Sequence, residues 1–184
     1  MKGTAFLKIQ TNRTVLRPLC MDDLQAAYAW QSCAATQVYN NAPHTDISQT
    51  VEYLEWVTAE WQGNHQKYYA FGIEVGGQLI GEIGFSLGCG KCGRCTAGEA
   101  AIGYVVHKDF WGNGYEAEVV NAVIKHCFSL GAEKVKLSCD VKDVANLQLI
   151  ESLGMRLMLE NEDCEYSDGR PFVRNTYFLE PMTT

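Results

Sequence analysis

The stretch Glu99-Ala-Ala-Ile-Gly-Tyr-Val-Val106, followed four residues later by Trp111-Gly-Asn-Gly-Tyr115, decides the fold of this chain. The first run is apolar and rich in β-branched and aromatic residues, which is typical of a buried strand. From Glu116 to Leu130, apolar residues recur at helical spacing and predict an amphipathic helix. A strand, a glycine turn and a helix together present unpaired backbone N–H groups to an anion, and glycine lets a phosphate approach closely. The sequence therefore predicts a phosphate-binding turn around Gly112 and Gly114.

Two common phosphate-binding motifs do not describe this turn. The chain contains no nucleotide P-loop, and the dinucleotide motif needs a third glycine where Ala117 stands. The phrase Asp109-Phe-Trp-Gly-Asn-Gly-Tyr-Glu-Ala-Glu118 instead resembles the GNAT N-acetyltransferases, which bind the pyrophosphate of acyl-CoA on a [Q/R]-x-x-G-x-[G/A] turn. It is similar to the branch that includes the acetyltransferases of ribosomal-protein N-termini. In this comparison Trp111 takes the Gln/Arg position, Gly114 is the central glycine, and Glu116 replaces the usual Ala or Gly.

Three further segments resemble the same branch, in the same order along the chain. Thr14–Leu19 resembles its first strand, Asp143–Met155 its last helix, and Asp168–Leu179 its closing hairpin strand. The resemblance implies an α/β (mixed α+β) GNAT fold, with a mixed, mostly antiparallel central sheet of six to seven strands and about four helices. This sheet would be splayed at its central parallel pair. We expect residues 1–184 to form a single domain of this kind.

Periodicity and turn signals predict the remaining elements. Strands are predicted at Val15–Leu19, Tyr68–Val75, Gln78–Leu87, Lys134–Asp140, Met155–Leu159 and Pro171–Leu179, with a leader or edge strand over residues 1–12. Helices are predicted at Asp22–Ser32, from Asp46 or Ser48 to Gln62, and at Asp143–Gly154. Lys134–Asp140 should run parallel to the central strand, because a crossover of helix length joins the two.

Composition limits the class of protein. Of the 184 residues 47% are hydrophobic, which is typical of a globular chain. No apolar run approaches the roughly 20 residues of a membrane helix, and the N-terminus has no apolar core of signal-peptide length. We therefore expect a cytoplasmic protein with reduced cysteines and no membrane partner. The net charge of −7 argues against a nucleic-acid partner and suits a cationic one, such as an amine.

The resemblance implies acetyl transfer from acetyl-CoA, the co-substrate, to a primary amine by direct attack. The acceptor would be a protein N-terminus or a small amine, and the oligomeric state stays open, a homodimer included. The turn residues expected to hold the pyrophosphate are Trp111, Gly112, Asn113, Gly114, Tyr115, Glu116 and Ala117. In the family, the pantetheine arm pairs with the exposed edge of the central strand. By position, this role falls on the backbone of Val105 and Val106.

The general base has two candidates. Many branch members carry a carboxylate at the position of Ala101, and Glu99 lies on the same strand face because strand side chains alternate. Glu82, on the neighbouring strand, is the second candidate. The other interpretation of each is a solvated carboxylate at the end of a strand. A base is also not required, because water could carry the amine proton away.

The general acid is open as well. Many family members use a tyrosine on the last helix, where this chain has Ile150. Asn146 can donate a hydrogen bond to sulfur but cannot supply a proton at neutral pH, so it is a candidate CoA contact. The alternative interpretation is that Asn146 is a polar residue near the start of a helix and has no role in binding CoA. Tyr104 and Cys139 are fallback donors.

Cys89, Cys92 and Cys95 form a C-x-x-C-x-x-C pattern in a glycine-rich loop. Three thiols at this spacing could bind zinc or another soft metal, but structural zinc prefers four ligands. Candidates for a fourth ligand are Cys139, Cys164, His107 or a partner chain. We assign no metal site, and the other interpretation is a hairpin tip with reactive thiols. Two alternatives to the enzyme remain. One is a CoA-binding scaffold without turnover, which Glu116, Ala101 and the missing tyrosine suggest, and the other is a metal-sensing module that uses these cysteines.

Overall fold

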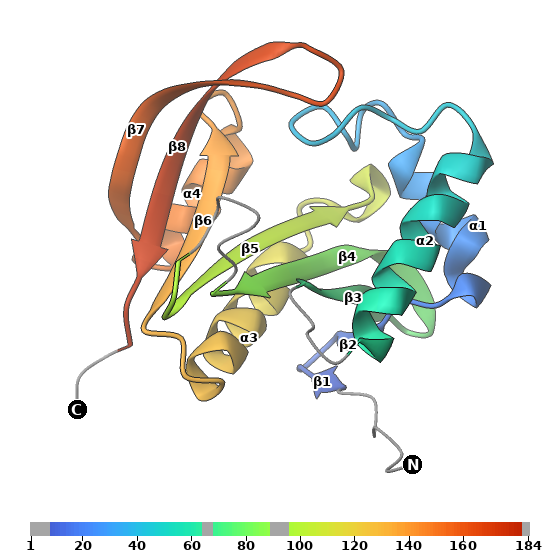
Figure 1. Ribbon diagram of the computed structural model, residues 1–184, viewed down its shortest axis with the longest axis horizontal. Helices are drawn as coiled ribbons and strands as arrows, with labels where there is room; N and C mark the ends of the chain where they lie inside the picture. Colours follow the sequence, from blue (N-terminus) through green and yellow to red (C-terminus); the bar gives the residue numbers. More distant parts are fainter. Residues whose placement is uncertain (1–7, 64–67, 89–95, 182–184) are drawn as a thin grey trace.

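One mixed β-sheet with helices on both faces organises the chain (Figure 1). The structure, a computed structural model, describes residues 8–63, 68–88 and 96–181. Its strands are β1 (Ile9–Gln10), β2 (Val15–Pro18), β3 (Tyr68–Val75), β4 (Gln78–Leu87), β5 (Glu99–Val106), β6 (Lys134–Asp140), β7 (Arg156–Glu165) and β8 (Pro171–Leu179). Its helices are α1 (Leu24–Gln31), α2 (Ile47–Gln62), α3 (Tyr115–Ser129) and α4 (Val144–Ser152), with 3-10 turns η1 (Met21–Asp23) and η2 (Lys108–Phe110).

The strands lie in the order β1-β2-β3-β4-β5-β6-β8-β7. Neighbouring strands are antiparallel except for the central pair, β5 and β6, which is parallel as the crossover through α3 requires. These two strands pair only from Glu99–Ile102 against Lys134–Leu137, although both continue further. They therefore part at their carboxyl ends, and the splay that the resemblance implies is confirmed.

Helices on the two faces of the sheet bury two groups of apolar side chains. The predicted apolar stripe of α3 packs on one face, with Val119, Val120, Val123, Ile124 and Cys127 all buried. On the other face, α1 and α2 bury Ala27, Trp30, Leu54 and Val57. Asp46 caps α2, because its carboxylate accepts a hydrogen bond from the Ser48 N–H at 2.8 Å. The free end of β5 lies between these two helical layers.

The sheet has eight strands, more than the six to seven expected. The predicted edge segment forms β1 over two residues, and β7 continues to Glu165, beyond the predicted end at Leu159. The register of β7 shifts on both sides of Leu159, and Asn161 has a φ of 57°. The polar run after Leu159 hid this strand, because an exposed edge strand needs no apolar alternation. No helix in residues 8–63, 68–88 or 96–181 has the length and hydropathy needed to cross a bilayer.

Candidate active site

The turn between η2 and α3 presents backbone N–H groups that no side chain caps. Gly112 and Gly114 both have a φ of 75°, in the left-handed region that favours glycine. Gly114 is the N-cap of α3, so the first-turn N–H donors of the helix are available to a ligand. The helix dipole adds positive potential at the same place. The turn therefore has the geometry of an anion-binding site.

Arg13 braces this turn. Its Nη1 donates to the Asn113 carbonyl at 2.8 Å, and its Nε donates to the Glu118 carboxylate at 2.7 Å. Its guanidinium lies over the ring of Tyr115, 4.8 Å from the ring centroid. The side chains of Asn113 and Tyr115, both predicted to hold the cofactor, do not line the adjoining cavity: the Asn113 amide donates to the carbonyls of Phe110 and Trp111, and the Tyr115 ring contacts Arg13.

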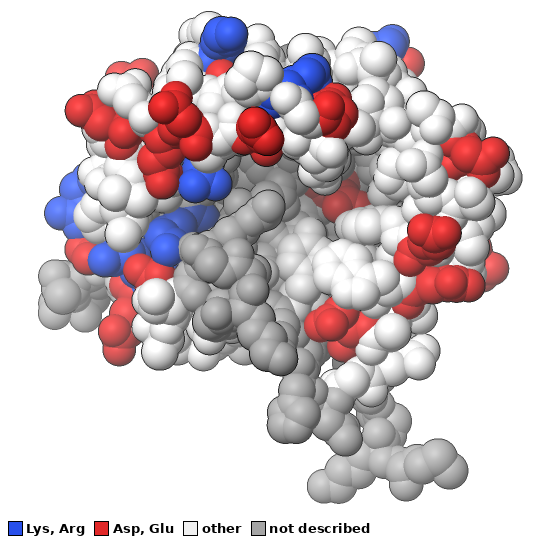
Figure 2. Space-filling view, turned by 45° about the horizontal axis from the view of Figure 1, so that its top comes forward, with Lys and Arg blue, Asp and Glu red and all other residues white. Residues whose placement is uncertain are grey.

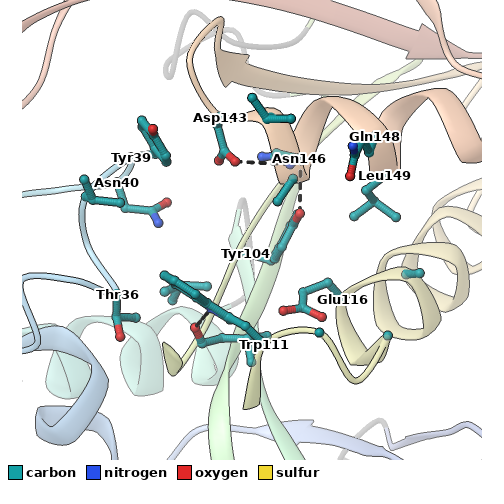
Figure 3. Close-up of a pocket in the computed structure, with 18 of the residues that line it drawn as sticks. Thr36, Tyr39, Asn40, Tyr104, Trp111, Glu116, Asp143, Asn146, Gln148 and Leu149 are labelled. Atoms are coloured by element: carbon teal, nitrogen blue, oxygen red, sulfur yellow. Dashed lines mark hydrogen bonds between the residues drawn. The ribbon is translucent and has the colours of Figure 1, made fainter. Parts of the chain in front are cut away.

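A cavity of about 720 Å³, here called the first cavity, opens where α3 begins and α4 faces the end of β5 (Figure 3). Of the residues predicted to bind the cofactor, those that line it are Val105, Val106, Trp111, Gly112, Gly114, Glu116, Ala117 and Asn146. The indole N–H of Trp111 donates to the Val106 carbonyl at 2.7 Å, which fixes the ring against the cavity. Lys142 adds a cationic side chain to the lining, and a cation near a diphosphate favours its binding.

Where β5 leaves β6, the backbone of Tyr104 and Val106 faces the free edge of the strand, and the Val106 carbonyl on this edge already accepts the Trp111 indole N–H. The N–H of His107 donates to the Ile80 carbonyl of β4 at 2.8 Å. Backbone groups alternate between the two sides of a strand, so Val105 also directs its N–H and carbonyl toward β4. The prediction that Val105 pairs with the pantetheine arm through its backbone is therefore corrected. Tyr104, rather than Val105, lies on this edge beside Val106.

Glu116 points into the first cavity, between Trp111 and Tyr104 (Figure 3). Its side chain is half-buried, and burial raises the pKa of its carboxyl. The family whose turn this one resembles has Ala or Gly here. A carboxylate at this position repels an incoming diphosphate, because the partly desolvated surroundings screen the two charges poorly.

We expect the Glu116→Ala variant to bind acetyl-CoA about tenfold more tightly than the wild type, since the repulsion is removed. Calorimetric titration measures this, and S-acetylpantetheine, which lacks the diphosphate, is the matched ligand and should bind both proteins equally. In the wild type, the affinity for acetyl-CoA should also rise as the pH falls and the raised pKa lets Glu116 take up a proton. A weaker affinity in the variant would show that Glu116 helps to hold the cofactor, and an unchanged affinity would show that its carboxylate does not repel the diphosphate.

A second cavity, of about 600 Å³, lies on the sheet face covered by α1 and α2. The residues that it shares with the first cavity are Tyr39, Asn40, Tyr104 and Val105. The β7–β8 hairpin reaches the loop before α2 across this cavity (Figure 1). Two hydrogen bonds join them: the Ala42 N–H donates to Ser167 Oγ at 3.2 Å, and Arg170 Nη1 donates to the Val38 carbonyl at 3.3 Å. Because Tyr39, Asn40, Tyr104 and Val105 line both cavities, a ligand in one cavity would meet a ligand in the other at this shared wall.

Glu82 lines the second cavity, directly opposite Val105 in the β4–β5 pair. The hydroxyl of Tyr53 donates to its Oε1 at 2.6 Å. Its Oε2 is buried and has no hydrogen-bond partner among the described residues. Burial raises the pKa of the Glu82 carboxyl to about 7. A carboxylate with one unpaired oxygen and a near-neutral pKa is suited to accept a proton.

Glu99, the other candidate base, lines neither cavity. Its carboxylate forms an ion pair with Lys136 at 2.7 Å and accepts the Thr96 N–H at 2.8 Å. The ion pair with Lys136 lowers the pKa of Glu99 to about 2. A group this acidic is a poor base at neutral pH, so we retain Glu82 alone. Glu99 instead fastens the start of β5 to β6.

Asn146 faces Tyr104 where α4 begins (Figure 3). The Tyr104 hydroxyl donates to Asn146 Oδ1 at 3.1 Å, and the Asn146 N–H donates to the Asp143 carboxylate at 3.1 Å. Burial raises the pKa of Tyr104, and it raises that of Cys139 to about 12. Ile150 is buried in the core. Of the predicted donors, Tyr104 is the one that lines both cavities.

Sequence reasoning did not connect Tyr53 with Glu82, and it assigned no role to the backbone of Tyr104. The signal for Tyr53 was present, because Thr50 and Val57, three residues before it and four residues after it on the same helix face, are buried. Tyr53 therefore belongs to the inward stripe of α2, where its hydroxyl needs a buried partner.

The cysteine pattern lies outside the described residues, since Cys89, Cys92 and Cys95 all fall in the gap between 88 and 96. Within the described ranges, no group of three or more His, Cys, Asp or Glu side chains is placed to hold a metal ion. The described cysteines are free thiols.

Comparison with known proteins gives one family and a consistent set of relatives. The family described as Acetyltransferase (GNAT) domain matches residues 13–156. The uncharacterized N-acetyltransferase YoaA of Bacillus subtilis is 27% identical over 175 residues, which is 93% of this chain and 95% of the relative. The fold is shared with the ribosomal L7/L12 alpha-N-protein acetyltransferase RimL in complex with CoA, with a TM-score of 0.79, 18% identity, and coverage of 95% of this chain and 98% of that one. It is also shared with the microcin C7 self-immunity acetyltransferase MccE in complex with acetyl-CoA and AMP, with a TM-score of 0.79, 17% identity, and coverage of 92% and 93%.

The family match spans most of the chain, including the glycine turn, the splayed strands and α4. The chain therefore belongs to the acetyltransferase (GNAT) domain family, and it is an acyl-CoA-dependent acetyltransferase with acetyl-CoA as its co-substrate.

Proposed function

We propose that this enzyme acetylates a primary amine by direct attack on acetyl-CoA, with the donor in the first cavity and the acceptor in the second. The observation that carries the proposal is the buried Glu82 carboxyl, whose pKa is about 7 and whose Oε2 has no partner among the described residues. It lines the acceptor cavity one strand away from the shared wall. A base in this place can deprotonate an amine beside the thioester.

The donor side of the proposal rests on backbone groups. The N–H groups of residues 112–117 would hold the diphosphate, and the backbone of Tyr104 together with the Val106 N–H would pair with the pantetheine amides. This placement leads the thioester to the wall that the two cavities share. Lys142 would offset part of the diphosphate charge.

The reaction needs one proton to leave the amine before attack. The Glu82 carboxylate takes a proton from the ammonium, and the nitrogen lone pair then attacks the thioester carbonyl carbon. The new C–N bond forms, the C–S bond breaks, and the thiolate leaves. The nitrogen loses its second proton, and the sulfur gains one, which the Tyr104 hydroxyl beside Asn146 is placed to relay. The products are the amide and free CoA.

The hairpin bridge favours a small amine over a protein N-terminus as acceptor. Ser167 and Arg170 join the α1–α2 loop across the second cavity, and this bridge narrows the approach for a folded partner. A protein N-terminus remains the second candidate, because one similar fold belongs to an acetyltransferase of ribosomal protein L7/L12.

The test is CoA thiol release from acetyl-CoA in the presence of small amines and of N-terminal peptides. Amine-dependent release, with the acetylated amine identified by mass spectrometry, is the expected result. Binding of acetyl-CoA without release for any amine would instead support a scaffold protein.

A further inference from the structure

The charges that line the second cavity do not balance. Lys136 is paired with Glu99 at 2.7 Å, and Arg174 is paired with Glu162 at 3.3 Å, so both cations are neutralised. Three more carboxylates line the cavity without a cation among the described residues: Glu82, Asp140 and Glu165. Figure 2 shows the hollowed face, with acidic side chains above it and to its right and basic side chains to its left. Among the residues that the structure describes, the lining of this cavity therefore carries an excess of negative charge.

Two of these carboxylates lie on opposite sides of the splay. Glu82 is paired with Val105 across β4 and β5. The parallel register of β5 and β6 sets Ile102 beside Leu137, and its continuation would set Val105 level with Asp140. Neighbouring residues in register share a face, so Glu82 and Asp140 face the same cavity from two strands apart. Their backbones are at least about 10 Å apart, since each step between strands is about 4.8 Å.

The Asp140 end of the cavity is built to hold a charge. Asp140 is buried, and its carboxylate accepts the Tyr166 hydroxyl at 2.9 Å and the Lys142 N–H at 2.8 Å. These donors fix the carboxylate but leave its negative charge in place. Glu165, next to Tyr166, is exposed at the same end and lines the cavity. Glu82, at the other end, is the buried group with an unpaired oxygen.

We propose that the acceptor is a linear diamine or polyamine, whose reacting amine lies at Glu82 and whose second ammonium lies between Asp140 and Glu165. This inference rests on the proposed function and names its substrate class. The second ammonium takes no part in bond making or breaking; it orients the chain and raises the affinity of the cavity for substrates with two positive charges. The distance across the splay suits an extended alkyl chain that lies over the sheet face.

The experiment compares matched amines by kcat/KM for thiol release at constant acetyl-CoA. Putrescine, cadaverine and spermidine are the test substrates, and pentylamine, in which a methyl group replaces one ammonium of putrescine, is the matched monoamine. We expect at least one of the diamines or polyamines to exceed pentylamine by about tenfold or more, and the difference to shrink in high salt. Equal values for all the amines, or a preference for a neutral N-terminal peptide, would overturn the inference while leaving acetyl transfer intact. No release with any amine would overturn the proposed function as well.

Glu165→Gln and Glu165→Lys test the second ammonium site without disturbing a buried group. The ratio of kcat/KM for the preferred diamine to that for pentylamine should fall by about fivefold in the first variant and further in the second. Glu160→Gln and Glu160→Lys are matched controls, because Glu160 is exposed on the same strand and does not line the cavity. If the two Glu160 variants lower the ratio as much as the Glu165 variants do, the effect is one of net charge and the site is not where we place it.

Discussion

The Glu82→Gln variant is expected to lose about 100- to 1000-fold in kcat while binding acetyl-CoA as tightly as the wild type. The amide keeps the volume and can still accept the hydrogen bond from Tyr53, but it cannot take a proton. The wild-type rate should rise with pH and level off above about pH 7, where the Glu82 carboxyl is ionised. The variant should lose this dependence. Stopped thiol-release assays across pH measure both effects.

Glu99→Gln is the matched control for this experiment, since it makes the same change at the other predicted base. It should keep nearly all of the wild-type kcat and lose only the ion pair with Lys136. A large loss in Glu99→Gln together with a small loss in Glu82→Gln would reverse our assignment of the base.

Glu82→Gln is also expected to make the folded protein more stable, although it lowers the activity. Burial raises the pKa of Glu82 from 4.5 to about 7 in the folded state, so folding favours the protonated carboxyl. Protonation of Glu82 contributes on the order of 3 kcal/mol to the free energy of unfolding. This contribution is complete below about pH 4.5 and is lost as the pH rises through 7. Glu82→Gln should therefore unfold at a higher temperature than the wild type above neutral pH, with little difference in acid. Thermal unfolding followed by circular dichroism measures this difference.

The second large effect is expected for Gly114→Val, which should weaken acetyl-CoA binding by about 100-fold. Gly114 has a φ of 75°, and a β-branched residue is strained in this region. Relief of the strain would move the first-turn N–H groups of α3, which we place against the diphosphate, and each hydrogen bond to a charged group contributes about 1.5–3 kcal/mol. Calorimetric titration with acetyl-CoA measures the loss.

Gly77→Val controls for strain alone. Gly77 has a φ of 84° in the β3–β4 turn, and nothing lies within 4 Å of the position of an added Cβ. The two variants should lose similar stability, but Gly77→Val should bind acetyl-CoA normally. S-acetylpantetheine should bind Gly114→Val almost as it binds the wild type. Equal weakening of acetyl-CoA and S-acetylpantetheine would contradict the diphosphate role of the turn.

The sequence predicted the helices and most strands because each has a local signal. The stripe of α3, the cap at Asp46 and the glycines of the turn act over a few residues. The end of β7 had no such signal, since Glu160 to Glu165 are polar and lie on an edge strand. Its bulges also break the alternation that would mark a strand.

The choice between Glu82 and Glu99 could not be made from the sequence, because burial and pairing decide it. Both are strand carboxylates in similar local contexts. The packing of Tyr53 from α2 buries Glu82, whereas Lys136 from β6 neutralises Glu99. The role of Val105 could not be predicted from the sequence either. Its backbone direction depends on which residues of β5 form hydrogen bonds with β4. If the register between two strands shifts by one residue, each backbone N–H and carbonyl points to the opposite side of the strand, and the local sequence pattern does not determine which side that is.

The central claim is that donor and acceptor meet at the wall formed by Tyr39, Asn40, Tyr104 and Val105. A crystal structure of the complex with acetyl-CoA tests it most directly. We predict that the diphosphate lies on the N–H groups of residues 112–117, and that the thioester lies at this wall, facing Glu82. A diphosphate bound elsewhere, or a thioester directed away from the second cavity, would contradict the claim.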